Sequence, residues 1–433
     1  MKAEQLIFYR DAGEHGLLYS MCRLMERRIA GVSQKLNDAE EQEYFSCVAQ
    51  LYEYASENGF YGNLWHCYLT ELLVYNENPY TIACEMRGEV QGSLRQAVLH
   101  DLQLFMEFFK YNLYKLDTVF KTDSLVKAMH YEASQKKAIK YNRHISAEIC
   151  ALAVRLAGAA DAEAFRLELD EFYGKYGVGV FGLHKAFRVE HTRECLQINP
   201  IYNIAVTGLD DIIGYEIPKK KLIDNTEAFL QGQKANNCLI FGDAGTGKSS
   251  SIRAILNQYY GRGLRMIEVY KHQYQELNDL IDRLKCRNYK FIIYMDDLSF
   301  EEFETEYKYL KAVIEGGLES KPDNVLIYAT SNRRHLIREN FTDKDGDGGD
   351  IHKNETVQEK LSLFGRFGVS IYFGAPNKTE FQEIVLGLAK KYGLRMPEEQ
   401  LLAEANKWEL SHGGLSGRCA RQFIDAMRGQ ESI

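Results

Sequence analysis

Proline is scarce in this chain, and long apolar runs are missing. Only 6 of the 433 residues are proline, and Pro79 is the only one before Pro200. No stretch approaches the ~18 uninterrupted apolar residues of a membrane-spanning helix, and a charge interrupts the N-terminal segment before any run long enough for a signal peptide. We therefore expect no membrane crossing, and a first half made of helices with few breaks.

The 9 cysteines include no C-x-x-C pair, and their odd number fits poorly with a closed disulfide framework. A reducing, cytoplasmic location is the simpler expectation. The formal net charge of -8 argues against a surface that wraps nucleic acid as a whole, although it is compatible with a local basic patch. The length favours two or three domains.

Residues 1–195 show helical periodicity. Apolar side chains recur three to four positions apart, as in Leu102, Phe105, Phe109 and Leu113, so that each set lines one helix face. The stripes are rich in Tyr and Phe, which at this spacing indicates core packing more than a binding surface. We interpret 1–195 as a helical N-terminal domain with an interaction or regulatory role.

The pattern changes after residue 195, where short apolar runs alternate with helical stretches. The runs cover residues 238–241, 265–269, 291–295, 325–329 and 369–373. Continuous apolar runs separated by helices predict buried parallel strands with helices on both faces of the sheet. The predicted fold is therefore of the α/β class, with a five-stranded parallel αβα core over 196–376 and a helical lid over 377–433.

The segment "GDAGTGKS", Gly242 to Ser249, lies between the first run and a helical stretch, and it fits the phosphate-binding pattern G-x-x-x-x-G-K-[ST]. Its glycines allow backbone N–H groups to converge on phosphate oxygens, and the helix N-terminus adds its dipole. Lys248 is predicted to reach the β and γ phosphates, and the Ser249 hydroxyl to bind Mg²⁺. The predicted contacts are Gly242, Asp243, Ala244, Gly245, Thr246, Gly247, Lys248, Ser249 and Ser250.

A second magnesium anchor is expected where "FIIYMDDLSF" ends a strand. Asp296 and Asp297 fall at the carboxyl edge of the predicted sheet, where ligand sites of open parallel sheets lie. Asp296 is predicted to hold Mg²⁺ through water, and Asp297 to orient or deprotonate the attacking water. Capping of the following helix by this pair is the structural alternative.

With these motifs, the chain from about Thr207 to Arg428 resembles the ATPase module of the AAA+ superfamily. It looks most like a little-characterised bacterial branch of AAA+ ATP-binding proteins of unknown function, in which an Asp-Asp-Leu-Ser-Phe segment follows the magnesium strand, as Asp296 to Phe300 do here. The resemblance implies ATP and Mg²⁺ as ligands. The helical N-terminal half matches only by its position.

The resemblance also implies residues for the base and for the attacking water. The segment "GLDDIIGYE" is similar to the one that lies against adenine, which makes Ile213 and Gly214 candidate base contacts. Asn332, in "VLIYATSNRR", takes the position of a sensor that hydrogen-bonds the γ-phosphate or the water. A plain turn and a loop cap are the respective alternatives.

Two arginines take further roles by resemblance. Arg366, in "EKLSLFGRFGVSIYF", looks like the arginine finger that points into a neighbouring subunit's nucleotide, which implies a homo-oligomer, either a ring or a dimer. Arg418, in "GGLSGRCARQF", is favoured over Arg421 for a γ-phosphate contact. A surface salt bridge and solvated helix charges are the alternatives.

The chain departs from the family pattern after the magnesium Asp, where most AAA+ hydrolases have Glu. Asp297 is one methylene shorter, and because catalysis is sensitive to such displacements, we expect slow hydrolysis. Glu301 and Glu302 on the following helix are alternative bases.

Two further stretches have less specific patterns. Residues 343–355, "DKDGDGGDIHKNE", begin like a calcium loop, but Asn354 stands where a bidentate Glu is required, so we interpret them as an acidic loop. Residues 129–144 mix Lys136, Lys137, Lys140 and Arg143 with tyrosines, as single-strand binders do, but a solvated helix face explains them as well.

The sequence thus predicts an AAA+ ATPase that couples ATP binding or hydrolysis to oligomer assembly and to remodelling of a macromolecular partner, with a protein held by the N-terminal domain as the expected partner. Two alternatives remain. One is an ATP-gated binding switch with slow or no hydrolysis, which Asp297 favours. The other is a nucleic-acid motor or loader, which the acidic balance disfavours.

Overall fold

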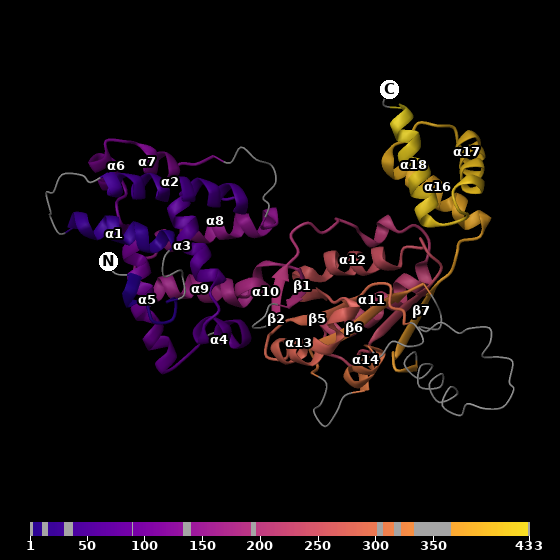
Figure 1. Cartoon of the computed structure of the whole chain (residues 1–433), viewed down its shortest axis with the longest axis horizontal. Coiled ribbons are helices and arrows are strands. Elements are labelled where there is room, and N and C mark those ends of the chain that lie inside the picture. Colours follow the sequence, from indigo (N-terminus) through magenta and orange to yellow (C-terminus); the bar gives the residue numbers. More distant parts are fainter. Residues whose placement is uncertain are drawn as a thin grey trace. The chain divides into compact units, whose positions relative to one another are not determined.

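The structure, a computed structural model, describes residues 3–10, 16–29, 38–88, 90–132, 140–191, 196–300, 306–315, 322–332 and 365–431. The chain divides into two compact units, Met1–His184 and Lys185–Ile433, which are described separately (Figure 1). In the described ranges no helix is both long and apolar enough to cross a membrane.

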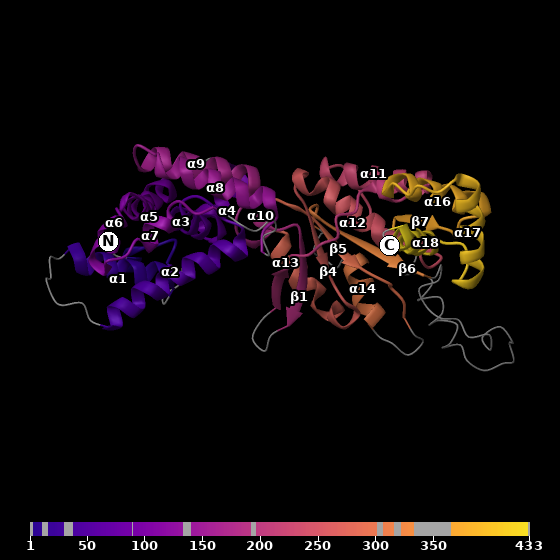
Figure 2. The same cartoon turned by 90° about the horizontal axis from the view of Figure 1, so that it is seen from above.

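The described part of the first unit is built mainly from helices, drawn in indigo to magenta in Figures 1 and 2. Helix α3 packs against α8, while α4 and α5 pack against α9. The predicted stripe of Leu102, Phe105, Phe109 and Leu113 is buried, so these side chains form core rather than surface. The elements are η1 (Ala3–Gln5), α1 (Leu17–Ile29), α2 (Asp38–Asn58), α3 (Leu64–Tyr75), α4 (Pro79–Arg87), α5 (Ser93–Lys110), α6 (Tyr114–Phe120), α7 (Ser124–Ala128), α8 (Arg143–Ala157), α9 (Ala162–Tyr176) and α10 (Gly179–Leu183).

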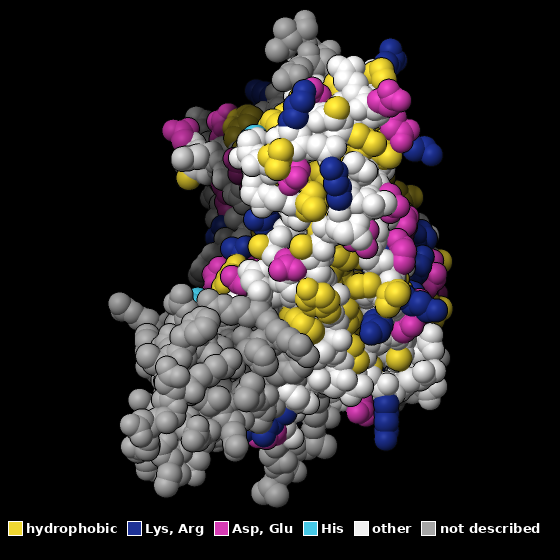
Figure 3. All heavy atoms as spheres, turned by 90° about the vertical axis from the view of Figure 1, so that its right-hand side faces the viewer, with side chains coloured by type: hydrophobic (Ala, Val, Ile, Leu, Met, Phe, Trp, Pro, Cys, Tyr) yellow, Lys and Arg dark blue, Asp and Glu magenta, His cyan; other side chains and the backbone are white. Residues whose placement is uncertain are grey.

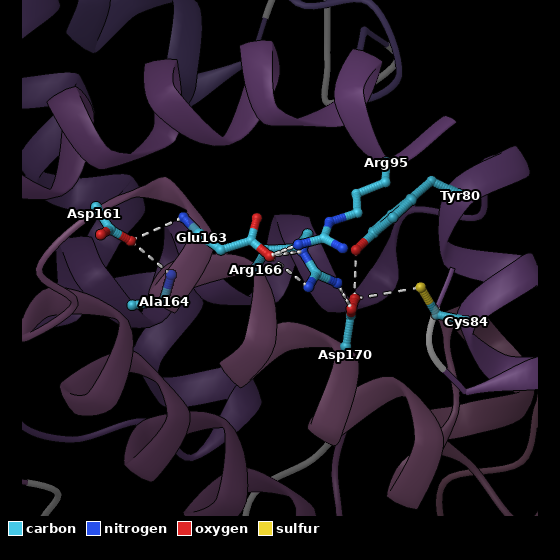
Figure 4. A network of polar contacts seen from close by, with 8 residues as sticks. All are labelled: Tyr80, Cys84, Arg95, Asp161, Glu163, Ala164, Arg166 and Asp170. Atoms are coloured by element: carbon cyan, nitrogen blue, oxygen red, sulfur yellow. Dashed lines mark hydrogen bonds and ion pairs between the residues drawn. The ribbon is translucent and has the colours of Figure 1, made fainter. Parts of the chain in front are cut away.

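A buried ionic network joins α9 to α4 (Figure 4). The guanidinium of Arg166 contacts the carboxylate of Asp170, and its Nη2 lies 2.7 Å from Oε1 of Glu163. Asp170 also accepts a hydrogen bond from the Tyr80 hydroxyl, and Sγ of Cys84 lies 3.3 Å from it. Burial opposes the charge of Arg166, but its partners outweigh burial and raise its pKa. Both buried charges are therefore compensated.

The second unit contains a seven-stranded sheet in the order β2-β1-β4-β5-β6-β3-β7. All neighbouring strands are parallel except the antiparallel pair β1 and β2. The strands are β1 (Ala186–His191), β2 (Leu196–Pro200), β3 (Cys238–Gly242), β4 (Leu264–Glu268), β5 (Lys290–Met295), β6 (Val325–Ser331) and β7 (Val369–Phe373). The predicted α/β core is confirmed, since β3 to β7 are the five expected parallel strands.

The predicted strand count was too low because β1 and β2 extend the sheet. In β1, Phe187 and Val189 are buried while Arg188 and Glu190 are exposed, so its apolar run is not continuous. The second compact unit begins at Lys185, and it includes β1, which pairs with β4. Strands with one solvated face alternate in polarity and lack the signal of a strand buried on both faces.

Helices cover both faces of the sheet (Figure 1). On one face, α11 (Glu216–Leu230) and α12 (Lys248–Tyr259) bury Leu222, Ile252 and Ile255 in one cluster with the strand residues Ile240 and Tyr294. On the other face lie α13 (Leu277–Leu284) and α14 (Glu306–Glu315), with the 3-10 turns η2 (Leu209–Asp211), η3 (Tyr260–Arg262) and η4 (Lys271–Glu276) elsewhere in the unit. The parallel strands therefore end at one edge, where polar loop residues meet.

A three-helix lid follows β7 and has its own core. Its helices are α16 (Lys378–Tyr392), α17 (Glu398–Ser411) and α18 (Gly417–Glu431). A capping box between Asn377 and Glu380 begins α16, and Phe381, Leu401 and Phe423 are among the buried core residues.

The network around Arg166 generates a stability prediction. Asp170→Asn should lower the free energy of unfolding by about 3 kcal/mol, because it leaves the buried guanidinium with less compensating charge. The matched control is Asp123→Asn in the pair with Lys127, whose two side chains are each 67% exposed, where we expect a change below ~0.5 kcal/mol. Urea unfolding measures both, and equal small changes would contradict the prediction.

Candidate functional site

The predicted phosphate loop connects β3 to α12, and two of its glycines are required by their surroundings. Gly242 has a φ of 138°, and a Cβ there would lie 2.0 Å from the carbonyl oxygen of Phe373 on β7. Gly245 has a φ of 77°, and its Cβ would lie 3.0 Å from Cβ of Arg418 on the lid. The loop is therefore held between the sheet and α18, in a shape that side chains would disrupt.

Lys248 begins α12 and turns back over the loop. Its Nζ donates to the carbonyl oxygens of Gly242 at 2.9 Å and of Asp243 at 2.6 Å. Burial lowers the pKa of Lys248, and the charge of Asp243 partly offsets that effect. The Asp243 carboxylate itself accepts from the backbone N–H of Ala375 at 2.7 Å, which ties the loop to the segment between β7 and the lid.

Asp296 follows β5 and connects three elements. Its Oδ1 accepts from the hydroxyl of Ser249 on α12 at 2.8 Å and from that of Thr330 on β6 at 2.5 Å. Partial burial raises the pKa of Asp296, but the neighbouring hydroxyls and the charge of Arg253 outweigh it, so that the pKa lies below its usual value. An ionised carboxylate beside a hydroxyl is the oxygen donor set that suits Mg²⁺.

This donor set fits magnesium better than a metal enclosed by protein ligands. The described ranges contain no group of three or more His, Cys, Asp or Glu side chains that would enclose an ion. Mg²⁺ usually takes one or two protein ligands and fills its remaining positions with phosphate oxygens and water. Ser249 and Asp296 would meet this requirement on the protein side.

Asp297 adopts a φ of 51°, in the left-handed region that Asp tolerates better than most residues. Its backbone N–H donates to the Thr330 hydroxyl at 3.0 Å, and its carboxylate accepts from Nδ2 of Asn332 at 2.8 Å. The left-handed turn thus allows Asp297 to reach the end of β6. The two residues predicted to place the attacking water are in direct contact.

One cavity of about 530 Å³ gathers most of the predicted site residues. It is lined by the loop from Ala244 to Ser250, by Asp296, Asp297 and Asn332, and by Ile213 and Arg418. Gly242, Asp243 and Gly214 are not among the lining residues, and Gly214 has a φ of 79° beside Ile213. The contact of Gly214 with a base remains a prediction.

Apolar side chains from the core and the lid form another part of the lining. Ile213 lies against α16, where a Cβ on Gly387 would come within 2.6 Å of its Cδ1. Ile384 and Leu388 of the same helix also line the cavity. Such surfaces suit the faces of a planar base.

Several lining residues were missed in the sequence. Thr330 is a polar residue inside an apolar run, so its hydroxyl could be noticed in the sequence. The sequence did not show which group this hydroxyl would contact. Asp211 pairs with Lys391 of the lid, and this hydrogen bond holds the pKa of Asp211 below its usual value. Arg253, which the sequence did not single out, also lines the cavity, as does Arg421, the alternative to Arg418.

Arg366 is not a lining residue of this cavity. Its guanidinium forms a salt bridge with Glu315, the last residue of α14. This contact is the simpler alternative that the sequence left open, and a role toward a neighbouring subunit remains a prediction. Residues 343–355, Glu301, Glu302, Lys136 and Lys137 lie outside the described residues.

Residues 182–431 match the family described as "Protein of unknown function (DUF815)". No curated protein matches the chain.

Solved structures of RuvB from Thermotoga maritima are similar at low identity. Two variants are each 16% identical, with a TM-score of 0.37, and the matches cover 52% of this chain and 66% of theirs. The Holliday junction branch migration motor is 14% identical, with a TM-score of 0.32 and coverage of 51% and 72%. The chain thus spans about two thirds of the length of the first two, and the similarity carries no argument about function.

The hydroxyl of Thr330 should contribute to the stability of the fold. Thr330→Val should lower the free energy of unfolding by about 1–3 kcal/mol at neutral pH, because the Asp297 N–H and Asp296 each lose a partner. Thr330→Ser keeps the hydroxyl and should recover most of this loss. Urea unfolding measures both variants.

The same pair of variants predicts a pH dependence. The folded-state pKa of Asp296 lies below its unfolded value, so the stabilisation is complete above that unfolded value, ~3.9, and is lost as the pH falls through the folded value. The difference between wild type and Thr330→Val should therefore shrink below about pH 4. A difference that is constant from pH 7 to pH 3 would contradict this account.

Proposed function

We propose that this chain, which belongs to the family described as "Protein of unknown function (DUF815)", is an AAA+ ATPase that binds ATP with Mg²⁺. The observation that carries the proposal is the hydrogen bond between Ser249 and Asp296, 47 residues apart, beside the phosphate loop. It brings a hydroxyl and a carboxylate to the place where a metal ion would bridge phosphates. An ordinary glycine turn gives no reason for this pairing.

In this proposal the loop and the lid bind different parts of the nucleotide. The N–H groups from Ala244 to Ser250 bind the phosphates, and Lys248 exchanges its carbonyl acceptors for β and γ oxygens. Arg418 contacts the γ-phosphate, with Arg421 close by on the same lining. Ile213, Ile384 and Leu388 hold the adenine. Mg²⁺ neutralises phosphate charge when it is bound.

Hydrolysis requires a water placed in line with the γ-phosphate. We assign this placement to Asp297 and Asn332, which line the same cavity and contact each other at 2.8 Å. Asp297 is one methylene shorter than Glu, which displaces the carboxylate and supports slow turnover.

A second candidate function, an ATP-gated switch, is supported by the contact between loop and lid. The backbone N–H of Arg418 donates to the carbonyl oxygen of Gly245 at 3.0 Å. A nucleotide that reshapes the loop therefore acts directly on α18, even when its γ-phosphate stays intact. Slow turnover together with a large nucleotide-dependent movement of the lid would favour this candidate.

Charge favours a protein partner over a nucleic acid, because the formal net charge of the chain is -8. The face of the molecule in Figure 3 mixes Lys and Arg with Asp, Glu and hydrophobic side chains. We propose that the helical N-terminal unit holds a protein, and strong, salt-dependent stimulation of turnover by DNA or RNA would overturn this choice.

Two substitutions separate binding from hydrolysis. Lys248→Ala should weaken ATP binding at least about tenfold, because it removes a charged donor to the phosphates. Asp297→Asn should preserve binding and lower turnover by about 10²-fold or more, because the amide cannot accept the proton. Calorimetry and phosphate release measure the two effects, and unchanged turnover in Asp297→Asn would reassign the base.

Assembly has its own test. If Arg366 serves a neighbouring subunit, turnover per chain should rise with protein concentration in step with the mass of the oligomer. Arg366→Ala should then lower turnover by ~10³-fold while leaving ATP binding intact. The matched control is Glu315→Gln, which breaks the same salt bridge but keeps the guanidinium. Equal effects of both variants, or full activity of a strictly monomeric sample, would contradict the role in trans.

A further inference from the structure

Tyr294 lies directly below the proposed magnesium site. It is the penultimate residue of β5, and Asp296 directly follows the end of this strand. The face of the sheet that carries Tyr294 is covered by α12, and Tyr294 belongs to the same buried cluster as Ile240 and Ile252. The residue is only 5% exposed. Its ring is therefore fixed by the core, with its hydroxyl toward the polar edge.

The Tyr294 hydroxyl is buried and has no hydrogen-bond partner in the described part of the chain. It lies beside Asp296, Ser249 and Thr330. Native proteins rarely leave such a donor unsatisfied, and exceptions often mark functional sites. A phenol donor therefore lies next to the proposed metal ligands without a hydrogen-bond partner.

Tyr328 is a neighbouring buried tyrosine whose hydroxyl is hydrogen-bonded, so it serves as a structural comparison for Tyr294. It is opposite Tyr294 on β6 and belongs to the same cluster. Its hydroxyl is 3.0 Å from both Nδ2 of Asn225 and Oγ1 of Thr226 on α11. The two tyrosines share strand register and burial, and they differ in whether the hydroxyl is bonded.

Three groups near Tyr294 have acceptor oxygens, and the Asp296 carboxylate is the best acceptor among them. Thr330 already donates to Asp296 and accepts from the N–H of Asp297, which leaves it one lone pair. The Ser249 hydroxyl would give a lone pair to Mg²⁺. The carboxylate of Asp296 has four lone-pair sites, and hydrogen bonds to an ionised acceptor are roughly twice as strong as those between neutral groups.

We propose that Tyr294 is a positioning residue of the magnesium site, whose hydroxyl donates to Asp296 when ATP and Mg²⁺ are bound. The phenol then holds the carboxylate from inside the sheet, while Ser249 and Thr330 hold it from α12 and β6. This inference rests on the proposed function. Donors that orient metal-holding groups typically contribute 10–100-fold to metal affinity.

The test compares Tyr294→Phe with Tyr328→Phe in the full-length chain. Calorimetry measures ATP affinity in excess Mg²⁺ and in EDTA, and thermal unfolding measures Tm without ligand. For Tyr294→Phe we expect affinity to fall about tenfold in Mg²⁺, to stay unchanged in EDTA, and Tm to stay equal to or above that of the wild type, because the lost hydroxyl had no partner. Tyr328→Phe should show the reverse: a lower Tm with unchanged dependence on Mg²⁺.

The outcomes separate this inference from the function on which it rests. If wild-type protein does not bind ATP in Mg²⁺, the proposed function fails. If the wild type binds and Tyr294→Phe binds equally well, the positioning role alone is overturned. That role is also overturned if Tyr294→Phe loses affinity equally in Mg²⁺ and EDTA, or loses as much Tm as Tyr328→Phe, because its hydroxyl would then be structural.

Discussion

The rest of the site depends on the hydrogen bonds that the carboxylate of Asp296 accepts. Hydrogen bonds to Ser249 and Thr330 join the end of β5 to the start of α12 and to the end of β6. Since β5 and β6 are neighbours and β3 delivers the loop on the other side of β6, these bonds fix the relative positions of the phosphate loop and both strand ends. The same residues would hold the metal, so that local stability and metal binding depend on one group.

The lid is connected to this edge at several points of different chemistry. The backbone of Gly245 accepts from Arg418, Ile213 packs on Gly387, and Asp211 pairs with Lys391. A ligand in the cavity would touch the loop, the segment around Ile213 and the lid together. Coupling between nucleotide and lid therefore needs no long pathway, because the elements that would move line the site itself.

Elements with a continuous local pattern could be predicted from the sequence. Buried parallel strands are apolar throughout, so β3 to β7 were visible, and the glycine loop and the Asp pair marked the edge where they end. It missed β1 and β2, whose residues alternate in polarity, and it missed Thr330 and Tyr294 as site residues. A Thr or Tyr inside an apolar run is typical of core, and only the pairing of β5 with β6 under α12 brings both residues to the edge of the sheet where Asp296 lies. Such convergence of distant segments is not encoded in local spacing.

The central claim is that the loop binds the phosphates of ATP while Ser249 and Asp296 hold the metal. A crystal structure of the protein with a non-hydrolysable ATP analogue and Mn²⁺, with anomalous diffraction recorded at the manganese edge, tests it most directly. The account predicts one anomalous peak per chain, with the Ser249 hydroxyl as a direct ligand, Asp296 reached directly or through water, and the triphosphate on Ala244 to Ser250. A triphosphate bound elsewhere, or manganese without contact to either residue, would contradict the account.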